Sequence, residues 1–449
     1  MILKFFVFEN NRLSFAEIYE TKTMREDFLH YLWRMKRFDL SDLHTTEGES
    51  LHIQQFGTHN THAGPDFLNA RVQIGDTLWA GNVEIHVNAS EWNAHGHQTD
   101  KAYDNVILHV VLEEDAPILR PGGQRIPCLE LRRRIPAGLQ ATYLKLLHNE
   151  HWIPCQHHFY TVSEMTKNLW LDRMLVERLE RKTALIAEVL QQSQNNWEET
   201  FYRFLARNFG LKVNAFPFEM LAQSLPLLTL AKHKNNPVQT EALLFGQAGL
   251  LDEEFTDEYP RQLQKEYNFL RKKHGLSPIP AQSWRFLRMR PANFPSIRLA
   301  QFSGLIQQSV HLFSKILEAD TVKEIENLFS VGLSDYWRTH YVFDKVSEER
   351  GKTLGKSTVH LFIINTIVPF LFLYGNEKAD ESYKEKAFRL LEELKPENNT
   401  IIKGWKKLGM QPASAYTTQA LLELKNEYCD KKRCLECAVG NKILRGDGA

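Results

Sequence analysis

The hydrophobic period of this sequence changes once, near residue 136, and that change constrains the fold more than any other feature. From about residue 50 to residue 135, short runs rich in β-branched residues alternate with turn residues, which is typical of strands. After residue 136, apolar residues recur at helical spacing in segments bounded by Pro, Gly and Asn. Because 449 residues exceed what one core usually organises, we expect more than one domain. The predicted fold class is α+β: a mixed sheet with flanking helices, followed by a large all-α region.

The predicted elements begin with an amphipathic helix over residues 24–40. Strands follow at residues 51–53, 70–74, 83–87 and 106–111, with a fifth at about 126–131. Gly75-Asp76-Thr77 lies between two of these strands and predicts a β-hairpin. The longest helix is expected over residues 164–191. We therefore divide the chain into an N-terminal extension (1–23), an α/β domain (24–150) and an all-α region that ends in a cysteine cluster (151–449).

Charge and hydropathy exclude several classes of protein. Lys and Arg number 55, as do Asp and Glu, so the formal net charge is zero. This excludes a histone-like chain and an acidic disordered chain, and a nucleic-acid contact would need a local basic surface. No run approaches the roughly 20 apolar residues of a membrane helix. Residues 359–374 come nearest, are interrupted by Asn365 and Pro369, and are expected to form a buried helix. Since the amino terminus lacks a secretory signal pattern, we expect a cytoplasmic protein without a membrane partner.

Three residues on the predicted hairpin carry the strongest chemical signal. Asp66 follows Pro65 at the entry of one strand, and Glu84 and His86 lie two residues apart on the next. Residues two apart on a strand point to the same face, and hairpin pairing places Asp66 near that face. Two carboxylates so placed can hold Mg²⁺ or Mn²⁺, which activates water and neutralises a phosphodiester. The alternative interpretation is an Asx-capped turn beside a solvated strand face.

This arrangement resembles the PD-(D/E)xK nuclease superfamily, whose pattern is Pro-Asp, a gap, and then Glu-x-Lys on the following strand. The resemblance implies a metal ion bound by Asp66 and Glu84, and a leading helix with an acidic residue, for which Glu26 is the candidate. It also implies a helix after the second motif, and residues 88–105 have the right length. His86 stands where the superfamily has lysine. Histidine can act near pH 7 as a base, a metal ligand or a neutral hydrogen-bond donor.

Further motifs occur in both parts of the chain. They are Gly64-Pro65-Asp66-Phe67, Gly81 through His86, Trp92 with His95 and His97, residues 106–111, Glu241 through Gly246, Arg288 through Pro295, and Tyr428 through Gly440. In these motifs the chain resembles, over nearly its whole length, a bacterial family catalogued only as domain of unknown function 2851. That resemblance names a family and implies no activity.

Besides His86, six histidines lie between residues 50 and 135: His52, His59, His62, His95, His97 and His109. His95-Gly96-His97, together with Asp100, can line the same cleft and bind a transition metal or a phosphate. Zinc at these histidines is the alternative to Mg²⁺ held by carboxylates. A lone histidine is more often a surface or capping residue, and His109 shares a strand face with apolar residues, which favours a satisfied, half-buried side chain.

The cysteines form a separate candidate site. Cys429, Cys434 and Cys437 supply three thiolates on one short segment, and a closed zinc or iron–sulfur site needs a fourth. Cys155 is the preferred fourth ligand and Cys128 the weaker one. The spacing resembles the [4Fe–4S] staple of some PD-(D/E)xK nucleases, which implies a structural role. Zinc and [4Fe–4S] are both open, and the alternative is a set of reduced thiols packed under the last helix.

The leading hypothesis is an intracellular phosphodiesterase that depends on Mg²⁺ or Mn²⁺ and acts on nucleic acid. Asp66 and Glu84 would bind the metal, and His86 and Glu26 would complete the catalytic set. The rival is a non-catalytic binding or scaffold protein with the same fold, and a third hypothesis is hydrolysis of another phosphate ester or of a sugar by the histidine-rich cleft. Residues 284–298 interleave four arginines with aromatics, a pattern suited to phosphates and unstacked bases, although the zero net charge favours a structural role.

Overall fold

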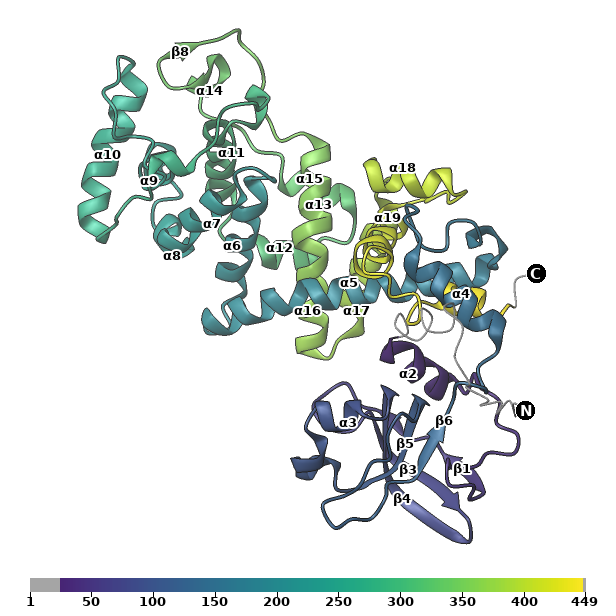
Figure 1. The fold of residues 1–449 in the computed structure, drawn as a ribbon. Helices are drawn as coiled ribbons and strands as arrows, with labels where there is room; N and C mark the ends of the chain where they lie inside the picture. Colours follow the sequence, from purple (N-terminus) through teal and green to yellow (C-terminus); the bar gives the residue numbers. More distant parts are fainter. Residues whose placement is uncertain (1–24, 447–449) are drawn as a thin grey trace, which may run out of the picture. The chain divides into compact units, whose positions relative to one another are not determined.

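The computed structural model describes residues 25–446, which form two compact units (Figure 1). Unit 1 contains the described residues up to Lys167 and those from Glu427 onward, and unit 2 comprises Asn168–Asn426. From the sequence we placed residues 151–449 in one all-α region. The structure differs, because it groups the carboxyl-terminal segment with the sheet. The expected N-terminal extension, residues 1–23, lies outside the described residues.

Unit 1 is built on one mixed sheet of six strands within the described range. The strands are β1 (Leu51–Gln55), β2 (Thr58–His59), β3 (Phe67–Ile74), β4 (Thr77–Asn88), β5 (Val106–Glu113) and β6 (Cys128–Glu130). Their order is β1-β3-β4-β5-β6, with β2 paired to β3. β1, β3 and β4 run antiparallel, whereas β4, β5 and β6 run parallel. The predicted α+β class with a mixed sheet is confirmed.

The β3–β4 hairpin forms where the sequence predicted it. Ile74 pairs with Thr77 across the turn, and Gly75 adopts a positive φ of 55°, which glycine tolerates best. The outer half of β4 is mostly exposed, whereas the half after Gly81 pairs with both β3 and β5 and is mostly buried. A Cβ at Gly81 would lie 2.5 Å from the carbonyl oxygen of Asn105, so this close approach of two chain segments requires glycine.

The connection from β4 to β5 differs from the single helix expected over residues 88–105. It contains a short helix, α3 (Glu91–Ala94), and two 3₁₀ turns, η1 (His97–Thr99) and η2 (Lys101–Tyr103). Gly96, at φ 79°, separates α3 from η1, and the Asp100 carboxylate accepts the Ala102 N–H to cap η2. The capped turns leave a loop, in place of a long helix, to carry His95 and His97.

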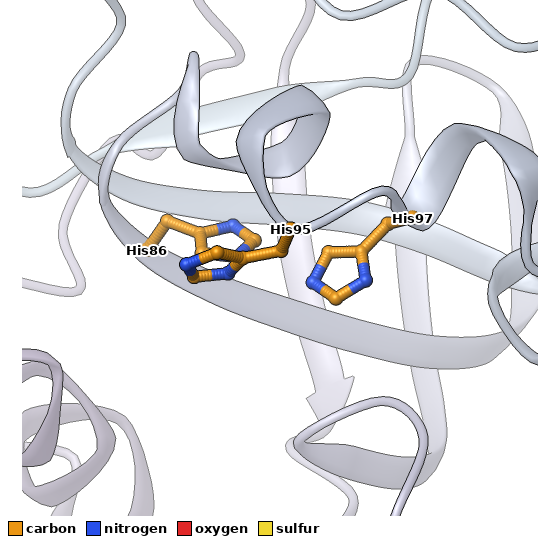
Figure 2. A group of neighbouring side chains, drawn as sticks. All are labelled: His86, His95 and His97. Carbon is orange, nitrogen blue, oxygen red and sulfur yellow. The ribbon is translucent and has the colours of Figure 1, made fainter.

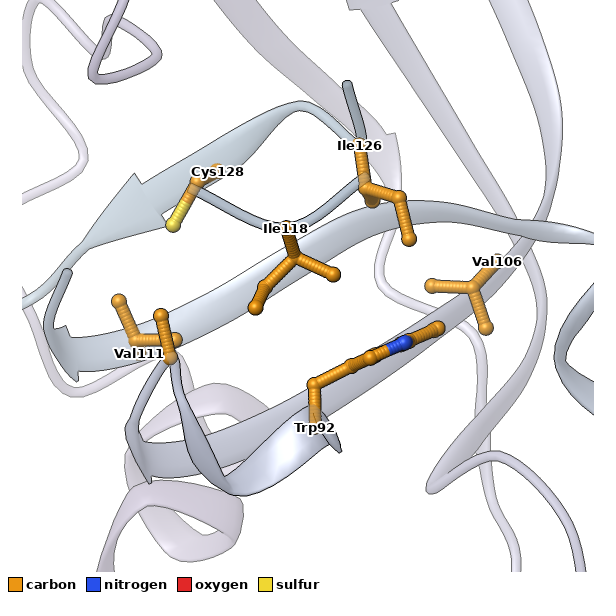
Figure 3. Packing of buried hydrophobic residues seen from close by; sticks show 7 residues of the cluster. Trp92, Val106, Val111, Ile118, Ile126 and Cys128 are labelled. Atoms are coloured by element: carbon orange, nitrogen blue, oxygen red, sulfur yellow. The ribbon is translucent and has the colours of Figure 1, made fainter. Parts of the chain in front are cut away.

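An apolar cluster anchors this connection to the sheet (Figure 3). Trp92 comes from α3 and Tyr103 from η2, and both pack on buried residues of the sheet and its loops. The other members of the cluster are Ala89, Val106, Val111, Ile118, Ile126 and Cys128. Because large aromatic side chains contribute most of the packing here, the cluster holds the histidine-bearing loop in one position.

Helix α2 (Glu26–Met35) packs against the sheet, mainly on β4. Its buried side chains are Phe28, Leu29, Tyr31, Leu32 and Trp33. The Trp33 Nε1–H donates to the Phe56 carbonyl at 2.9 Å, and the helix ends at Lys36 in the left-handed conformation. The helix expected over residues 24–40 is therefore present, and its Glu26 and His30 reach the site described below.

Two more helices complete unit 1, α4 (Ala137–His148) and α20 (Ala438–Arg445), with a 3₁₀ turn, η3 (Phe159–Thr161). The Lys432 ammonium donates to the carbonyl oxygens of Leu147 at 2.6 Å and Asn149 at 3.1 Å. Gly440 packs against the Cys434 backbone so closely that a Cβ would lie 2.2 Å from its carbonyl oxygen. These contacts are the physical reason that the carboxyl-terminal segment belongs to unit 1.

Unit 2 is helical apart from one short hairpin, β7 (His340–Val342) and β8 (Lys345–Val346). Its first helix, α5 (Glu164–Gln192), begins in unit 1. The others are α6 (Trp197–Phe209), α7 (Ala215–Ser224), α8 (Leu227–Ala231), α9 (Pro237–Gln247), α10 (Glu258–His274), α11 (Pro295–Gln308), α12 (Leu312–Glu318), α13 (Val322–Leu328), α14 (Tyr336–Thr339), α15 (Lys356–Phe362), α16 (Val368–Lys378), α17 (Glu381–Glu393), α18 (Thr400–Lys407) and α19 (Ala415–Glu423). The large helical region and its longest helix, expected over 164–191, are confirmed.

One helical stretch of the described residues, Lys356–Lys378, is long and apolar enough to cross a membrane. It consists of α15, a π-helical turn η6 (Ile363–Ile367) and α16. Within its most apolar window, 72% is buried inside the structure. The stretch is therefore packed as the core helix of a globular unit is, as predicted for residues 359–374.

Candidate functional site

Asp66 and Glu84 lie side by side, Asp66 at the start of β3 and Glu84 within β4. The Asp66 N–H donates to Glu84 Oε2 at 3.1 Å, and the Ile85 N–H donates to Asp66 Oδ2 at 2.9 Å. Each carboxylate thus accepts a hydrogen bond from the backbone beside the other, which orients both side chains. The hairpin brings the two acidic residues of the sequence pattern to one place.

Glu84 also reaches two histidines. Its Oε1 lies 3.3 Å from His97 Nε2 and 3.7 Å from His86 Nε2. Glu84 is only 4% exposed, so these contacts are largely shielded from solvent. One oxygen of this carboxylate therefore faces the Asp66 backbone, and the other faces two imidazoles.

Three imidazoles lie together in this part of unit 1 (Figure 2), and two of them, His86 and His97, contact Glu84. His86 comes from β4, and His95 and His97 come from the connection after α3. One ring nitrogen of each lies within 4.8 Å of the others, and His86 Nε2 is 3.2 Å from His95 Nδ1. His86 is buried, His97 is half-buried and His95 is exposed, so the group extends from the core of unit 1 to its surface.

His109, on β5, lies behind His86. The two ring nitrogens, His86 Nδ1 and His109 Nε2, are 2.8 Å apart, and both side chains are 1% exposed. Within the described part of the chain, His109 Nδ1 has no hydrogen-bond partner. His109 is thus fully buried where the sequence predicted a half-buried side chain, and it contacts the site directly.

Helix α2 adds two titratable groups. His30 Nε2 lies 3.1 Å from Asp66 Oδ2, and Glu26 Oε1 lies 3.9 Å from His86 Nε2. Glu26 is the acidic residue that the nuclease resemblance proposed for this helix. His30 was not predicted. Its position four residues after Glu26, on the same face of an amphipathic helix, is the signal that could have found it.

Carboxylates outnumber cations in this site. Among the described residues, no lysine or arginine pairs with Glu26, Asp66 or Glu84, whose ion-pair partners are histidines. Burial raises the pKa of Glu84 to about 9, and the Asp66 charge adds to that shift. Burial, followed by the charge of Asp66, also raises the pKa of Glu26. Among the described residues, the site therefore lacks the fixed positive charge of a lysine or arginine beside its carboxylates.

Burial favours the neutral form of the two innermost histidines, His86 and His109. Burial lowers the pKa of His86 to about 2 and that of His109 to about 3, and neighbouring imidazoles add to both shifts. For His30, burial lowers the pKa, but the contact with Asp66 and the nearby acids Glu26 and Asp27 together raise it above its usual value. A neutral His86 cannot supply the fixed positive charge of the lysine in the nuclease pattern. Neutral imidazole is, however, the form that binds metal ions.

Aromatic rings hold His97 in place. His97 stacks on Tyr103 with ring centroids 3.8 Å apart, and the Trp92 indole lies edge-on to both His97 and His109 at 5.4 Å. Trp92, His97 and Tyr103 also line a cavity of 170 Å³. Because Trp92 and Tyr103 are anchored in the apolar cluster, they fix the orientation of the His97 ring.

A groove of 410 Å³ in unit 1, which we call the basic groove, lies along α2, α4 and the carboxyl-terminal segment. Its charged lining residues are Arg25, Arg34, Lys431, Lys432 and Arg433, with Asp27 and Glu436 as the acids. His30 also lines the groove and contacts Asp66, so this residue connects the groove to the site. A chain of zero net charge thus has a local basic surface beside its buried carboxylates.

The cysteine candidates lie in the same unit. Burial raises the pKa of Cys434 to about 12, and the neighbouring Cys437 thiol adds to this shift. Burial raises the pKa of Cys155 as well, with contributions from Cys437 and Cys434. The fold therefore brings Cys155 near two thiols of the carboxyl-terminal segment. Cys429 is half-buried at the end of a π-helical turn, η7 (Leu424–Cys429), and Cys128 belongs to the apolar cluster of the sheet.

The arginine-rich segment, residues 284–298, has a structural component. Arg298 is 5% exposed and donates to Asn293 Oδ1 at 2.7 Å and Gln301 Oε1 at 3.1 Å. The other three arginines, Arg285, Arg288 and Arg290, are exposed. The segment lies in unit 2, away in sequence from the residues of the site.

A family profile described as protein of unknown function (DUF2851) matches residues 26–400, which is most of the chain. The chain belongs to the DUF2851 family. The DUF2851 match begins at Glu26 and includes Asp66, Glu84 and His86, but it ends before the carboxyl-terminal cysteines. No curated protein and no solved structure matches the chain. For this DUF2851 protein, the geometry of the site is therefore the basis for assigning a function.

Proposed function

We propose that this protein is a metal-dependent phosphodiesterase that acts on nucleic acid. The observation that carries the proposal is the junction of two features in unit 1. Asp66 and Glu84 meet on neighbouring strands, and the basic groove reaches Asp66 through His30. Carboxylates and imidazoles are ligands for divalent ions, whereas clustered Lys and Arg bind a phosphate backbone. For phosphodiester hydrolysis, the carboxylates would hold the divalent ion and the basic groove would bind the phosphate backbone.

The residues present fit a divalent ion, expected from the sequence to be Mg²⁺ or Mn²⁺. Glu26, Asp66 and Glu84 gather in one place, and their ion-pair partners in the described chain are histidines. A bound dication would neutralise these carboxylates, lower the pKa of a bound water and neutralise charge on the phosphodiester. The PD-(D/E)xK nuclease fold is the interpretation of unit 1 that goes with this chemistry.

The chain's own residues would bind the substrate and move protons. Arg34 and Lys431 line the basic groove and are exposed, so they can pair with backbone phosphates. Glu26 has a side chain 38% exposed and lies at the edge of the histidines, where it can exchange a proton with a water in the site. His86 is 1% exposed and has ring partners on both nitrogens, which suits a ligand better than a base.

A cleavage assay on single-stranded and duplex DNA tests this function. We expect cleavage by the full-length chain with Mn²⁺, and loss of cleavage in Asp66→Asn and Glu84→Gln. Asp76→Asn, on the exposed hairpin turn, is the matched control and should cleave as the wild type does. Equal activity in the Glu84 variant would identify a contaminant. Binding of DNA through the groove without cleavage would instead favour the non-catalytic scaffold.

A further inference from the structure

We infer that the ion of this site is a first-row transition metal bound by His86, His95, His97 and Glu84, with His109 as the outer partner of His86. This assignment deepens the proposed function and rests on it only for what the ion does in catalysis. The binding of the ion is argued from the donor atoms alone, and it is tested without measuring activity.

Three separations between donor atoms are close to those within one coordination sphere. Four ligands at about 2.1 Å from an ion, in a tetrahedron, lie about 3.4 Å from one another. The observed separations are 3.2 Å between His86 Nε2 and His95 Nδ1, and 3.3 Å between His97 Nε2 and Glu84 Oε1. His86 Nε2 and Glu84 Oε1 are 3.7 Å apart. One nitrogen of each of the three histidines lies within 4.8 Å of the others, so small rotations of these side chains would bring them and Glu84 Oε1 onto one ion.

The donor set selects the kind of ion. Mg²⁺ takes oxygen ligands and keeps several of its waters, whereas imidazole nitrogen suits zinc, iron and the later first-row metals. Three imidazoles and one carboxylate are thus a poor site for Mg²⁺ and a good one for Zn²⁺, Mn²⁺, Fe²⁺ or Co²⁺. His95 is exposed, so solvent reaches the ion from that side. An ion that accepts more than four ligands would keep a position there for water or a phosphate oxygen.

His109 completes the arrangement by contacting the far side of the His86 ring. If His86 binds the ion through Nε2, its proton must be on Nδ1, which lies 2.8 Å from His109 Nε2. His109 then accepts that N–H and holds the ring in the metal-binding tautomer, as outer partners of ligating histidines do. This contact also gives a physical reason for histidine at the position where the nuclease pattern has lysine. A protonated lysine has no lone pair with which to bind the ion.

The negative charge of the buried Glu84 carboxylate also favours a bound dication. Glu84 is 4% exposed, and the N–H of Asp66 is its backbone partner. A buried carboxylate without a lysine or arginine is costly unless another positive charge compensates for it. Bound ions are often the largest local charges in such sites. A dication next to Glu84 Oε1 would supply the missing charge, whereas Asp66 stays oriented by Ile85 and His30 outside the ligand set.

Cobalt titration of the full-length chain tests the assignment. After chelation, the protein should bind about one Co²⁺ at the histidines, with visible d–d absorption and no thiolate-to-cobalt charge-transfer band from this site. The double variant His95→Ala/His97→Ala should bind Co²⁺ at least about 100-fold more weakly, because two of four ligands are removed. His95 is exposed and His97 is half-buried, so circular dichroism and a melting curve of the variant show that its fold is kept. His52→Ala/His62→Ala, two exposed histidines of the same unit, is the matched control.

The possible results test the metal site and the proposed phosphodiesterase activity separately. Loss of the d–d bands in the His95/His97 variant and not in the control, with no displacement by excess Mg²⁺, supports the assignment. Unchanged Co²⁺ binding in that variant, or bands of thiolate character only, would overturn it. A loaded protein that shows the histidine bands but cleaves no DNA would contradict the proposed phosphodiesterase and leave the metal site established.

Discussion

His86 Nδ1 lies 2.8 Å from His109 Nε2, across two neighbouring parallel strands, and both side chains are 1% exposed. A pair of buried neutral imidazoles can share only one proton on this contact, so the position of that proton decides which nitrogen of His86 is available. With the proton on His86 Nδ1, Nε2 points its lone pair toward His95 and Glu84. The contact between His86 on β4 and His109 on β5 thus determines whether His86 Nε2 can accept a proton or bind a metal ion.

The first prediction concerns this contact. His109→Phe keeps a large ring in the core but removes the acceptor for the His86 N–H. We expect Co²⁺ affinity to fall about 10- to 100-fold, which is typical for loss of an outer partner of a ligating histidine. Isothermal titration with Co²⁺ measures it. His109→Gln, which offers an amide oxygen to the same N–H, should recover part of the affinity, and an unchanged affinity in His109→Phe would show that the contact does not matter.

The second prediction concerns the basic groove. Reversing two exposed charges, in Arg34→Glu/Lys431→Glu, should weaken binding of single-stranded DNA about 10-fold or more and reduce the slope of affinity against salt, because phosphate contacts release counterions. Fluorescence anisotropy over a salt series measures both. The control, Arg285→Glu/Arg288→Glu, makes the same charge change on exposed residues of unit 2. An equal loss in the control would mean that the groove has no special role.

The third prediction concerns the pH dependence of stability in unit 2. Glu241 on α9 is buried, and its Oε2 accepts from Tyr259 Oη at 2.8 Å and Trp337 Nε1 at 2.9 Å. Burial raises the pKa of this carboxyl above its usual value, despite these hydrogen bonds. A raised folded-state pKa means that stability is fully present below the unfolded-state pKa and falls as the pH rises through the folded-state pKa.

Glu241→Gln can keep both hydrogen bonds and has no charge to lose. We therefore expect its melting temperature to exceed that of the wild type at pH 8 and to approach it near pH 4, as measured by calorimetry. Glu241→Ala should lower stability at every pH by about 1–3 kcal/mol, because buried donors lose their acceptor. A gain in Glu241→Gln that does not depend on pH would contradict this account of the carboxyl.

The fourth prediction concerns the contact between α9 and α10. A Cβ at Gly246 would lie 2.0 Å from Cγ of Tyr267, whose hydroxyl is 3.0 Å from Gln247 Oε1. Gly246→Ala should therefore destabilise the protein by about 1–3 kcal/mol, the usual cost of overpacking. In Gly138→Ala, on α4, nothing lies within 4 Å of the new methyl group, so the higher helix propensity of alanine should leave stability unchanged or higher. Chemical denaturation compares them, and equal effects would exclude the steric explanation.

The fifth prediction concerns the cysteines. Cys155, Cys434 and Cys437 all lie in unit 1, where the other two thiols contribute to the raised pKa of Cys155, and Cys429 lies on the same carboxyl-terminal segment. We expect anaerobically purified protein to contain zinc, or iron with acid-labile sulfide, and to lose it in Cys434→Ser. Cys128→Ser, in the core of the sheet, should retain it. Metal analysis of the wild type, Cys434→Ser and Cys128→Ser tests this prediction. A wild type that contains neither zinc nor iron would mean that the cysteines are reduced thiols.

The sequence alone determined the local elements and the family. The β3–β4 hairpin follows from Gly75-Asp76 between two strand-forming runs, and the long α5 follows from its apolar period. These signals act over a few residues, so they are readable without the fold. These local signals did not predict where a turn residue interrupts a segment that otherwise has the hydrophobic period of a helix. Gly96, which has a positive φ, divides the segment expected as one helix over 88–105.

Only the tertiary structure decided which side chains make the site. His30 from α2, His109 from β5 and the two histidines after α3 meet β4 because helix and strands pack into one unit around a common core. No local pattern encodes that meeting, since it depends on register between strands and on the packing of Trp92 and Tyr103 beneath the loop. The same holds for the carboxyl-terminal segment. Contacts of Lys432 and Gly440, which no period predicts, place it with the sheet.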